Sequence, residues 1–170
     1  ARSNVLCLDK TGTITDGTMR VCEVEEIGKL KKVDNKNIIA NILYNQTTSN
    51  ATSNAMLIEF GKNNDLHLAY NIEFSSKRKC TLTSFEDLGT FVLGAPEFTN
   101  SKINDELKDK IFEHTSKGQR VLFLAHSKSM LNEKEEAPKN CEPLLLIAIE
   151  DHIREDAMET IEWFKQNNVQ

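Results

Sequence analysis

Apolar and polar positions along the chain follow two periods, one typical of strands and one typical of helices. Apolar runs predict buried strands, and extended segments separated by turn-prone residues predict an antiparallel meander. The predicted strands are 5–8, 67–74, 79–85, 90–93, 121–125 and 144–149. The predicted helices are 37–44, 52–62, 103–117 and 154–167, with a short one at Pro96. This succession predicts the α/β (α+β) class, with an antiparallel sheet flanked by helices.

Length and composition limit what the chain can be. Its 170 residues, 39% of them apolar, suffice for one ordinary domain or two small ones. The longest apolar run, 144–149, has six residues, whereas a membrane-spanning helix needs about 20. The first residues lack the basic and long apolar regions of a signal peptide. We therefore expect a chain that lies in the cytosol and makes no direct membrane contact.

Charge and cysteine content narrow the choice of partners. The formal net charge of -5 and the pI near 5.4 give no overall attraction for nucleic acid or anionic lipid, so no nucleic-acid partner is expected. None of the four cysteines stands in a Cys-x-x-Cys pair, which predicts ordinary reduced thiols. Residues 132–142 are charged and contain Pro138, which predicts a solvated loop.

The segment 9–15, Asp-Lys-Thr-Gly-Thr-Ile-Thr, directly follows the first apolar run. A carboxylate at the end of a strand can attack phosphorus, and Asp9 is the candidate nucleophile. Backbone N–H groups, Lys10 and the hydroxyls of Thr11 and Thr13 can hold phosphoryl oxygens. A Mg²⁺ ion shared with the phosphate is expected, with Asp9 and Thr11 as candidate protein ligands. The alternative is a capped turn without chemistry.

This heptad resembles the signature of the P-type ATPases, a branch of the haloacid dehalogenase superfamily. The resemblance implies that ATP and Mg²⁺ are the cofactors and that Asp9 forms an aspartyl phosphate. Phosphatases of the superfamily usually carry a second Asp at the position of Thr11. A hydroxyl has no useful pKa near 7 and activates water poorly. The acyl phosphate is therefore expected to be long-lived.

The segment 151–154, Asp-His-Ile-Arg, is similar to the family's Asp-Pro-Pro-Arg. Asp151 and Arg154 match, and the two prolines do not. In the family this segment returns the chain to the phosphorylation domain, and the resemblance implies that both residues contact the ribose and phosphates. The alternative for Asp151 is the N-cap of the final helix.

Three further segments resemble the family's nucleotide-binding domain. The stretch 73–79 implies that Phe74 stacks on adenine and that Lys79 attracts phosphate. The stretch 93–97, Leu-Gly-Ala-Pro-Glu, implies that Gly94 and Ala95 lie against the nucleotide. The stretch 118–122 makes Arg120 a candidate phosphate ligand. The alternatives are a core ring beside a solvated edge for Phe74 and a surface side chain for Arg120.

Two departures from the family pattern predict weak ATP binding. The family's lysine before Gly94 is Leu93 here, which removes a positive charge near the nucleotide. The family often places Glu at the position of Ser53, where it recognises the adenine amino group. Ser53 remains a candidate ligand, and Asn50 and Asn54 are possible substitutes. Each loss removes roughly 1 kcal/mol of favourable interaction.

The order of these motifs predicts how the chain is organised. Residues 1–21 and 143–170 are expected to be parts of an incomplete haloacid dehalogenase-like Rossmannoid phosphorylation domain, and 22–142 an inserted nucleotide-binding domain. A hinge is expected near Val21 and Glu142. Later family motifs that complete the Mg²⁺ site are absent from these 170 residues, so the chain alone is expected not to autophosphorylate.

The resemblance implies a cytoplasmic domain of an integral membrane protein that transports a cation, with Ca²⁺ or another hard cation as the guess. Its partners would be ATP and the transmembrane and actuator domains of the same polypeptide. Two other readings stay open: a haloacid dehalogenase-like phosphatase, and a non-catalytic interaction module. Thr11 argues against the first, while Leu93 and Ser53 keep the second open.

Overall fold

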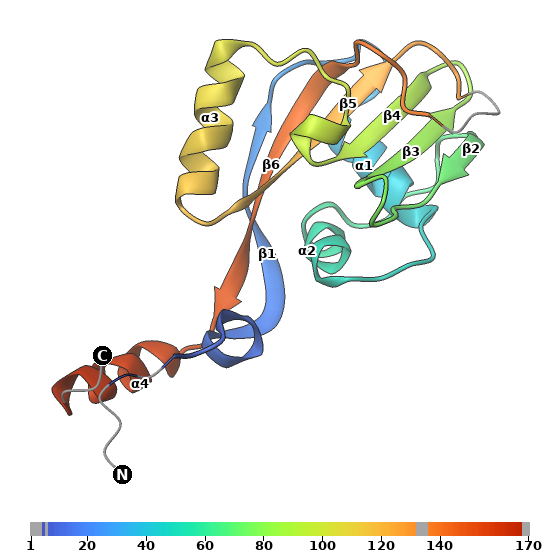
Figure 1. Ribbon diagram of the computed structural model, residues 1–170. Coiled ribbons are helices and arrows are strands. Elements are labelled where there is room, and N and C mark those ends of the chain that lie inside the picture. The colour runs from blue at the N-terminus through green and yellow to red at the C-terminus, as the bar shows by residue number, and fades with distance from the viewer. Residues whose placement is uncertain (1–4, 6, 132–135, 168–170) are drawn as a thin grey trace.

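One six-stranded antiparallel sheet organises the molecule (Figure 1). The computed structural model describes residues 5, 7–131 and 136–167. The strands lie in the order β1-β6-β5-β4-β3-β2, and each neighbouring pair is antiparallel. Their bounds are β1 Thr15–Glu26, β2 Leu68–Ile72, β3 Cys80–Phe85, β4 Gly89–Gly94, β5 Arg120–Ser127 and β6 Glu142–Ile153.

Helices cover both faces of this sheet. On one face α1 and α2 pack over side chains such as Phe91, Leu124 and Leu145. On the other face α3 packs through Ile111 over the strands β5 and β6. Because side chains alternate along a strand, Leu145 and Leu146 of β6 enter opposite faces. The helices are η1 Lys10–Ile14 (a π-helix), α1 Asn35–Tyr44, α2 Ala51–Phe60, η2 Pro96–Phe98 (a 3₁₀-helix), α3 Asp105–Ser116 and α4 Ala157–Gln166.

Polar side chains determine where three of the α-helices begin. The carboxylate of Asp34 accepts hydrogen bonds from two backbone N–H groups in the first turn of α1. Asn104 accepts one from Leu107 at the start of α3. Asn50 and Ser53 form a reciprocal capping box at the start of α2. These bonds satisfy backbone donors that have no partner within the helix.

The predicted antiparallel meander is confirmed in the strands β2, β3 and β4. The β3–β4 hairpin pairs in register from Cys80 with Gly94 to Phe85 with Gly89. Two residues at this turn have left-handed backbones, Asp87 within it at φ 59° and Gly89 directly after it at φ 90°. Only glycine adopts this conformation without steric cost. All residues of both strands are buried.

The strands β1 and β6 form a two-stranded ribbon that leaves the sheet and leads to η1 and α4 (Figure 1). Along the ribbon Thr15 pairs with Ile153 and Met19 pairs with Asp151. Three residues, 16–18, therefore lie opposite His152 alone. A bulge of this kind interrupts the ladder and bends the strand that carries it.

Two expectations about local structure need correction. The buried strand predicted at 5–8 is wrong, because Val5, Cys7 and Leu8 are exposed and outside any strand. No strand in the described part of the chain lies beside them to complete a ladder. The final helix begins at Ala157 and not at 154, since β6 continues to Ile153.

Some expectations fall outside what the structure describes. Part of the loop predicted at 132–142 and a strand suggested to begin at Val169 lie outside the described residues. The expected domain boundaries fall on elements of the sheet, since Val21 lies within β1 and β6 begins at Glu142.

All four cysteines are free, and burial raises the pKa of both Cys80 and Cys141 to about 11.

Candidate functional site

A cavity of about 690 Å³ opens beside the sheet near α2 and gathers residues from distant parts of the chain. Seven of the eight candidate nucleotide ligands line it, although they span about a hundred positions of the sequence. These seven are Ser53, Phe74, Lys79, Gly94, Ala95, Arg120 and Asp151. The eighth, Arg154, does not line the cavity. The volume of the cavity is in the range typical of small-molecule sites.

Apolar side chains form much of the cavity wall. Met56 of α2 and Leu93 of β4 are buried beneath it, and Leu122 of β5 adds to the same surface. The ring of Phe74 is 45% exposed and belongs to none of the buried clusters. An aromatic ring beside a largely apolar cavity offers a face on which a planar group can stack.

Two cationic side chains, Lys79 and Arg120, line the same cavity. Neither forms an ion pair or side-chain hydrogen bond with another described residue. Lys79 has a left-handed backbone, at φ 60°, and ends a tight turn in which its N–H donates to the carbonyl of Ser75 at 2.7 Å. Unpaired cations at the edge of a cavity attract anionic groups such as phosphates.

Gly94 ends β4 in direct contact with β3. A Cβ atom added at Gly94 would lie 2.5 Å from the Cβ of Cys80 and 2.6 Å from the carbonyl oxygen of Lys79. Its lack of a side chain is therefore required by the neighbouring strand. Ala95 follows as the extended N-cap residue of η2, at φ -63° and ψ 143°.

Ser53 lines the cavity, but its hydroxyl group is already occupied. It accepts a hydrogen bond from the N–H of Asn50 at 2.8 Å and lies 3.0 Å from the carbonyl oxygen of the same residue. The side chain of Asn50 in turn accepts from the N–H of Ser53 at 2.9 Å. The side-chain carbonyl of Asn54 accepts from Ser49 outside the cavity. The helix cap thus uses the hydroxyl of Ser53 and the side-chain oxygen of Asn50, and Ser49 uses the side-chain oxygen of Asn54.

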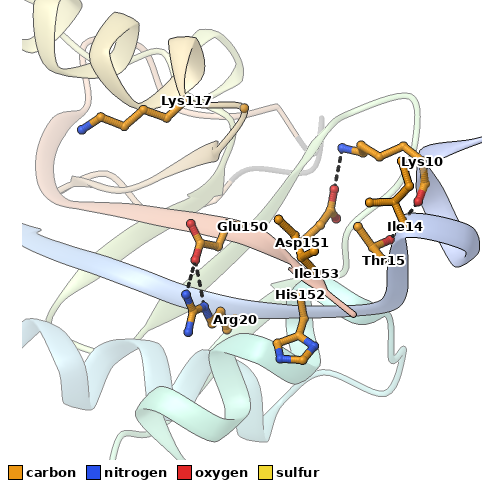
Figure 2. A pocket seen from close by; sticks show the side chains of 10 residues that line it. Lys10, Ile14, Thr15, Arg20, Lys117, Glu150, Asp151, His152 and Ile153 are labelled. Carbon is orange, nitrogen blue, oxygen red and sulfur yellow. Dashed lines mark hydrogen bonds and ion pairs between the residues drawn. The ribbon is translucent and has the colours of Figure 1, made fainter. Parts of the chain in front are cut away.

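A second cavity, of about 400 Å³, lies where the ribbon meets η1 (Figure 2). Lys10 reaches from η1 to Asp151 on β6, with Nζ 2.6 Å from Oδ2. Asp151 lines both cavities, and its side chain is 17% exposed. Nearby, Arg20 and Glu150 form an ion pair of 2.6 Å across the ribbon. Asp151 therefore connects the large cavity to the residue that follows Asp9.

The candidate nucleophile Asp9 is the residue before η1 and is exposed. Its side chain makes no cap hydrogen bond and lines neither cavity. The side chain of Thr11 lies outside the described part of the structure. Among the described residues no group of three or more His, Cys, Asp or Glu side chains is placed to hold a metal ion. Asp9 can supply one of the oxygen ligands that Mg²⁺ prefers. The described residues around Asp9 do not form a complete metal site.

The second half of the segment 151–154 makes its contacts at the end of the ribbon. The guanidinium of Arg154 binds the carboxylate of Asp156 through two contacts of 3.0 Å, and this bonding raises the pKa of Arg154. Its backbone N–H donates to the carbonyl of Ile14, which ties the end of β6 to η1. Asp151 is not a helix N-cap, because it lies within β6 and α4 begins only at Ala157.

At the ribbon bulge the carboxylate of Asp16 accepts from the hydroxyl and N–H of Thr18, at 2.6 and 2.8 Å. It also lies 2.8 Å from Nδ1 of His152. These contacts lower the pKa of Asp16 to about 2, with the Thr18 bonds as the main cause. His152 stands where the family has a proline, and here it joins the two strands of the ribbon.

Sequence reasoning missed several residues that line the large cavity. Gln46 and Thr81 are joined by a hydrogen bond of 3.3 Å. Met19, Glu97 and Phe98 also line this cavity. Glu97 ends the motif 93–97, which could have pointed to it. No signal in the sequence singles out Gln46, Thr81 or Met19, because they reach the cavity through the pairing of distant segments.

Comparison with known proteins shows long alignments to cation-transporting ATPases. The chain is 34% identical over 172 residues to the calcium-transporting ATPase CtpE of Mycobacterium bovis, and it covers 21% of that protein. It is 36% identical over 174 residues to the probable cation-transporting ATPase exp7 of Streptococcus pneumoniae, and it covers 22% of that protein. Each alignment includes 99% of this chain. The chain therefore spans about a fifth of the length of these relatives.

Solved structures show the same fold. A zinc-transporting PIB-type ATPase in the E2.Pi state matches 99% of this chain with a TM-score of 0.66 and 17% identity. A second structure of a zinc-transporting PIB-type ATPase, solved in a different state, matches 95% with a TM-score of 0.60 and 18% identity. In these matches the chain covers about a quarter of the solved protein, 25% and 24% respectively. No protein-family profile matches the chain.

The antiparallel sheet, its helices and the ribbon thus form a fold that is shared with a segment of these solved PIB-type ATPases. The sequence alignments are more specific: over nearly its whole length the chain is homologous to proteins named cation-transporting ATPases, of which it corresponds to one portion. No helix in the described part of the chain is long and apolar enough to cross a membrane.

Proposed function

We propose that this chain is the nucleotide-binding segment of a cation-transporting ATPase and that it presents ATP to Asp9. The observation that carries the proposal is the single cavity that gathers Phe74, Lys79 and Arg120. Asp151, at the edge of this cavity, is bonded to Lys10, the residue next to Asp9. A nucleotide in the cavity would thus have its phosphates directed toward the phosphorylation loop.

Each group in the cavity has a role that suits ATP. Phe74 stacks on the base, for about 1–3 kcal/mol by analogy with other aromatic–base contacts. Lys79 and Arg120 bind phosphate oxygens. Binding is weak, because Leu93 replaces a cationic residue and the hydroxyl of Ser53 serves the α2 cap.

The proposed chemistry is transfer of the γ-phosphoryl group of ATP to Asp9. An oxygen of the Asp9 carboxylate attacks the γ-phosphorus, a new O–P bond forms, and the bond to the β–γ bridging oxygen breaks. ADP leaves with that electron pair. Mg²⁺ bound with ATP supplies charge neutralisation, with Asp9 and Thr11 as its proposed protein ligands. The parent protein would use the aspartyl phosphate to drive transport of a cation, with Ca²⁺ as the leading candidate.

Transfer requires the cavity and Asp9 to approach each other. A two-stranded ribbon bends where both strands bend at the same level. The expected hinge residues, Val21 and Glu142, do not lie opposite each other, because Val21 pairs with Ile149. We therefore place the bend at residues 16–18 opposite His152, where the ladder is interrupted. The extent of the nucleotide-binding unit would then be about 15–153. Closure of this kind gates many phosphotransferases.

The non-catalytic interaction module remains the second candidate, because Leu93 and the capped Ser53 both weaken nucleotide contacts. It predicts no ATP binding, whereas the leading proposal predicts a weak but saturable site. The phosphatase reading predicts hydrolysis of a simple phosphate ester, for which Thr11 supplies no general base.

An ATP titration of the chain, followed by backbone amide NMR shifts, tests the proposal. We expect saturable shifts centred on Phe74, Lys79, Gly94 and Arg120. Phe74→Ala should weaken binding by about tenfold, the equivalent of 1.4 kcal/mol. The matched control is Phe112→Ala, whose ring on α3 is 73% exposed and outside the cavity; it should bind as the wild type does. Absence of saturable shifts at millimolar ATP would refute nucleotide binding.

A further inference from the structure

Gln46 and Phe74 both line the large cavity. Asn45 accepts a hydrogen bond from the side chain of Asn71 at 2.9 Å. Thr47 donates to the carboxylate of Glu73 from its N–H at 2.8 Å and from its hydroxyl at 2.6 Å. Gln46 stands between these two attachments. It is therefore held against the segment that leads directly into Phe74.

The order of strands separates Gln46 from Arg120 and Asp151 within the cavity. Gln46 bonds to Thr81, which lies on β3. Arg120 begins β5 and Asp151 lies near the end of β6, so both stand on the far side of β4. A nucleotide with its base against Phe74 and its phosphates toward Arg120 thus presents its base edge to Gln46.

The amide of Gln46 keeps its oxygen and one of its two N–H groups available. Its Nε2 donates to the hydroxyl oxygen of Thr81 at 3.3 Å, while its Oε1 has no bond to a described residue. A free amide oxygen accepts a hydrogen bond from an exocyclic amino group and is repelled by a carbonyl oxygen. At the corresponding position of the purine ring, adenine carries an amino group and guanine an oxygen.

We propose that Gln46 is the residue that selects the base, by accepting a hydrogen bond from the 6-amino group of adenine. Thr81 is a positioning residue that holds the amide with its oxygen free. This assignment rests on the proposed function, since it concerns which nucleotide the same cavity prefers. It gives the site a base-reading group that does not depend on Ser53, whose hydroxyl is committed to the α2 cap.

Glu97 also lines the cavity and carries a carboxylate that could accept the same hydrogen bond. It follows Gly94 by three residues and lies in η2, which contacts β5. Arg120 begins β5, so η2 lies beside the strand that carries this cation. In the proposed arrangement Glu97 is therefore assigned to the ribose and phosphate end of the nucleotide.

The test compares the affinity of the 170-residue chain for ATP, GTP and purine riboside triphosphate, which lacks the 6-amino group. The wild type should prefer ATP over purine riboside triphosphate by about fivefold, the effect of one hydrogen bond. In Gln46→Leu this preference should disappear. In Gln46→Glu, which keeps an acceptor oxygen, it should persist. In Thr81→Val the amide loses its partner, and discrimination against GTP should fall.

Control variants make the outcomes distinct. Gln166→Leu makes the same chemical change on α4, outside the cavity, and should leave all three affinities unchanged. ATP binding with the same base preference in Gln46→Leu as in the wild type would overturn this inference alone. Loss of the preference in Ser53→Ala or Glu97→Gln, with Gln46→Leu unaffected, would assign base reading to that residue instead. No ATP binding by the wild type would overturn this inference and the proposed function together.

Discussion

Gly94 occupies a position at which any side chain would displace a neighbouring strand. A Cβ atom there would meet both the Cβ of Cys80 and the carbonyl oxygen of Lys79 below 3.0 Å. We predict that Gly94→Ala lowers the free energy of unfolding by about 2 kcal/mol, the usual cost of overpacking. It should also weaken ATP binding, because the displaced backbone carries Lys79. Urea unfolding and an ATP titration measure the two effects.

Gly118 offers a control that separates overpacking from backbone strain. Its φ is +76°, and an added Cβ would have no atom within 4 Å. Gly118→Ala should therefore cost only about 1 kcal/mol, from the left-handed backbone. A smaller loss of stability in Gly94→Ala than in Gly118→Ala would contradict the packing argument.

Asp16 provides a test of the ribbon bulge by pH. Its pKa is lowered from 3.8 to about 2 by its bonds to Thr18 and His152. Since the folded pKa is depressed, its stabilising contribution is complete above about pH 4 and is lost as the pH falls through about 2. The difference in Tm between the wild type and Asp16→Ala should therefore be constant above about pH 4 and shrink toward about pH 2.

Circular dichroism at a series of pH values measures this difference. Asp109→Ala is a suitable control, because Asp109 is exposed on α3 and its side chain bonds to no described residue. Its effect on Tm should show no such change across the same range. A constant difference for Asp16→Ala down to about pH 2 would contradict the role assigned to the Thr18 bonds.

Much of the site was predictable because short motifs carry its chemistry. Phe74, Lys79, Gly94 and Arg120 were selected on local patterns, and the structure brings them to one cavity. Gln46 was not predictable, since its place depends on bonds to Thr81, a residue 35 positions away. The occupation of the Ser53 hydroxyl was also not foreseen, although Asn50 at the start of an apolar run is a recognisable cap.

At the scale of elements, periodicity predicted the sheet and helices where they bury apolar side chains. The predicted helix 37–44 and strand 121–125 lie within α1 and β5. Periodicity failed at the ribbon, where β1 from Thr15 to Glu26 carries mostly exposed and polar residues. A two-stranded ribbon exposes much of both faces, so no alternation marks it. Local reasoning also placed a strand at 5–8, for which the described chain supplies no pairing partner.

The whole molecule depends on β6, which lies between β1 and β5 in the sheet. A shortened chain of residues 22–142, the expected nucleotide-binding domain, would lose this strand and its buried side chains from Leu144 to Ile149. We predict that it does not unfold cooperatively. A chain of residues 15–153 retains all six strands, and its Tm should lie within a few degrees of the full chain. Thermal unfolding by circular dichroism measures both.

The contrast between these two chains locates the domain boundary. If residues 22–142 unfolded cooperatively with a Tm similar to that of the full chain, the boundaries expected from the sequence would stand. Cooperative unfolding of 15–153 alone would instead place the boundaries at the bulge of the ribbon. The second outcome is expected because an interior strand cannot leave a sheet without exposing its two neighbours.

If the large cavity binds a nucleotide as proposed, the ion pair between Lys10 and Asp151 would make nucleotide binding and loop position thermodynamically interdependent. Asp151 faces both cavities, so a phosphate that competes for Lys10 would release it from this carboxylate. Linkage is reciprocal: if the nucleotide favours the released loop by some factor, the released loop binds nucleotide more tightly by that same factor. The conformation of the loop that carries Asp9 would then depend on whether a nucleotide occupies the large cavity.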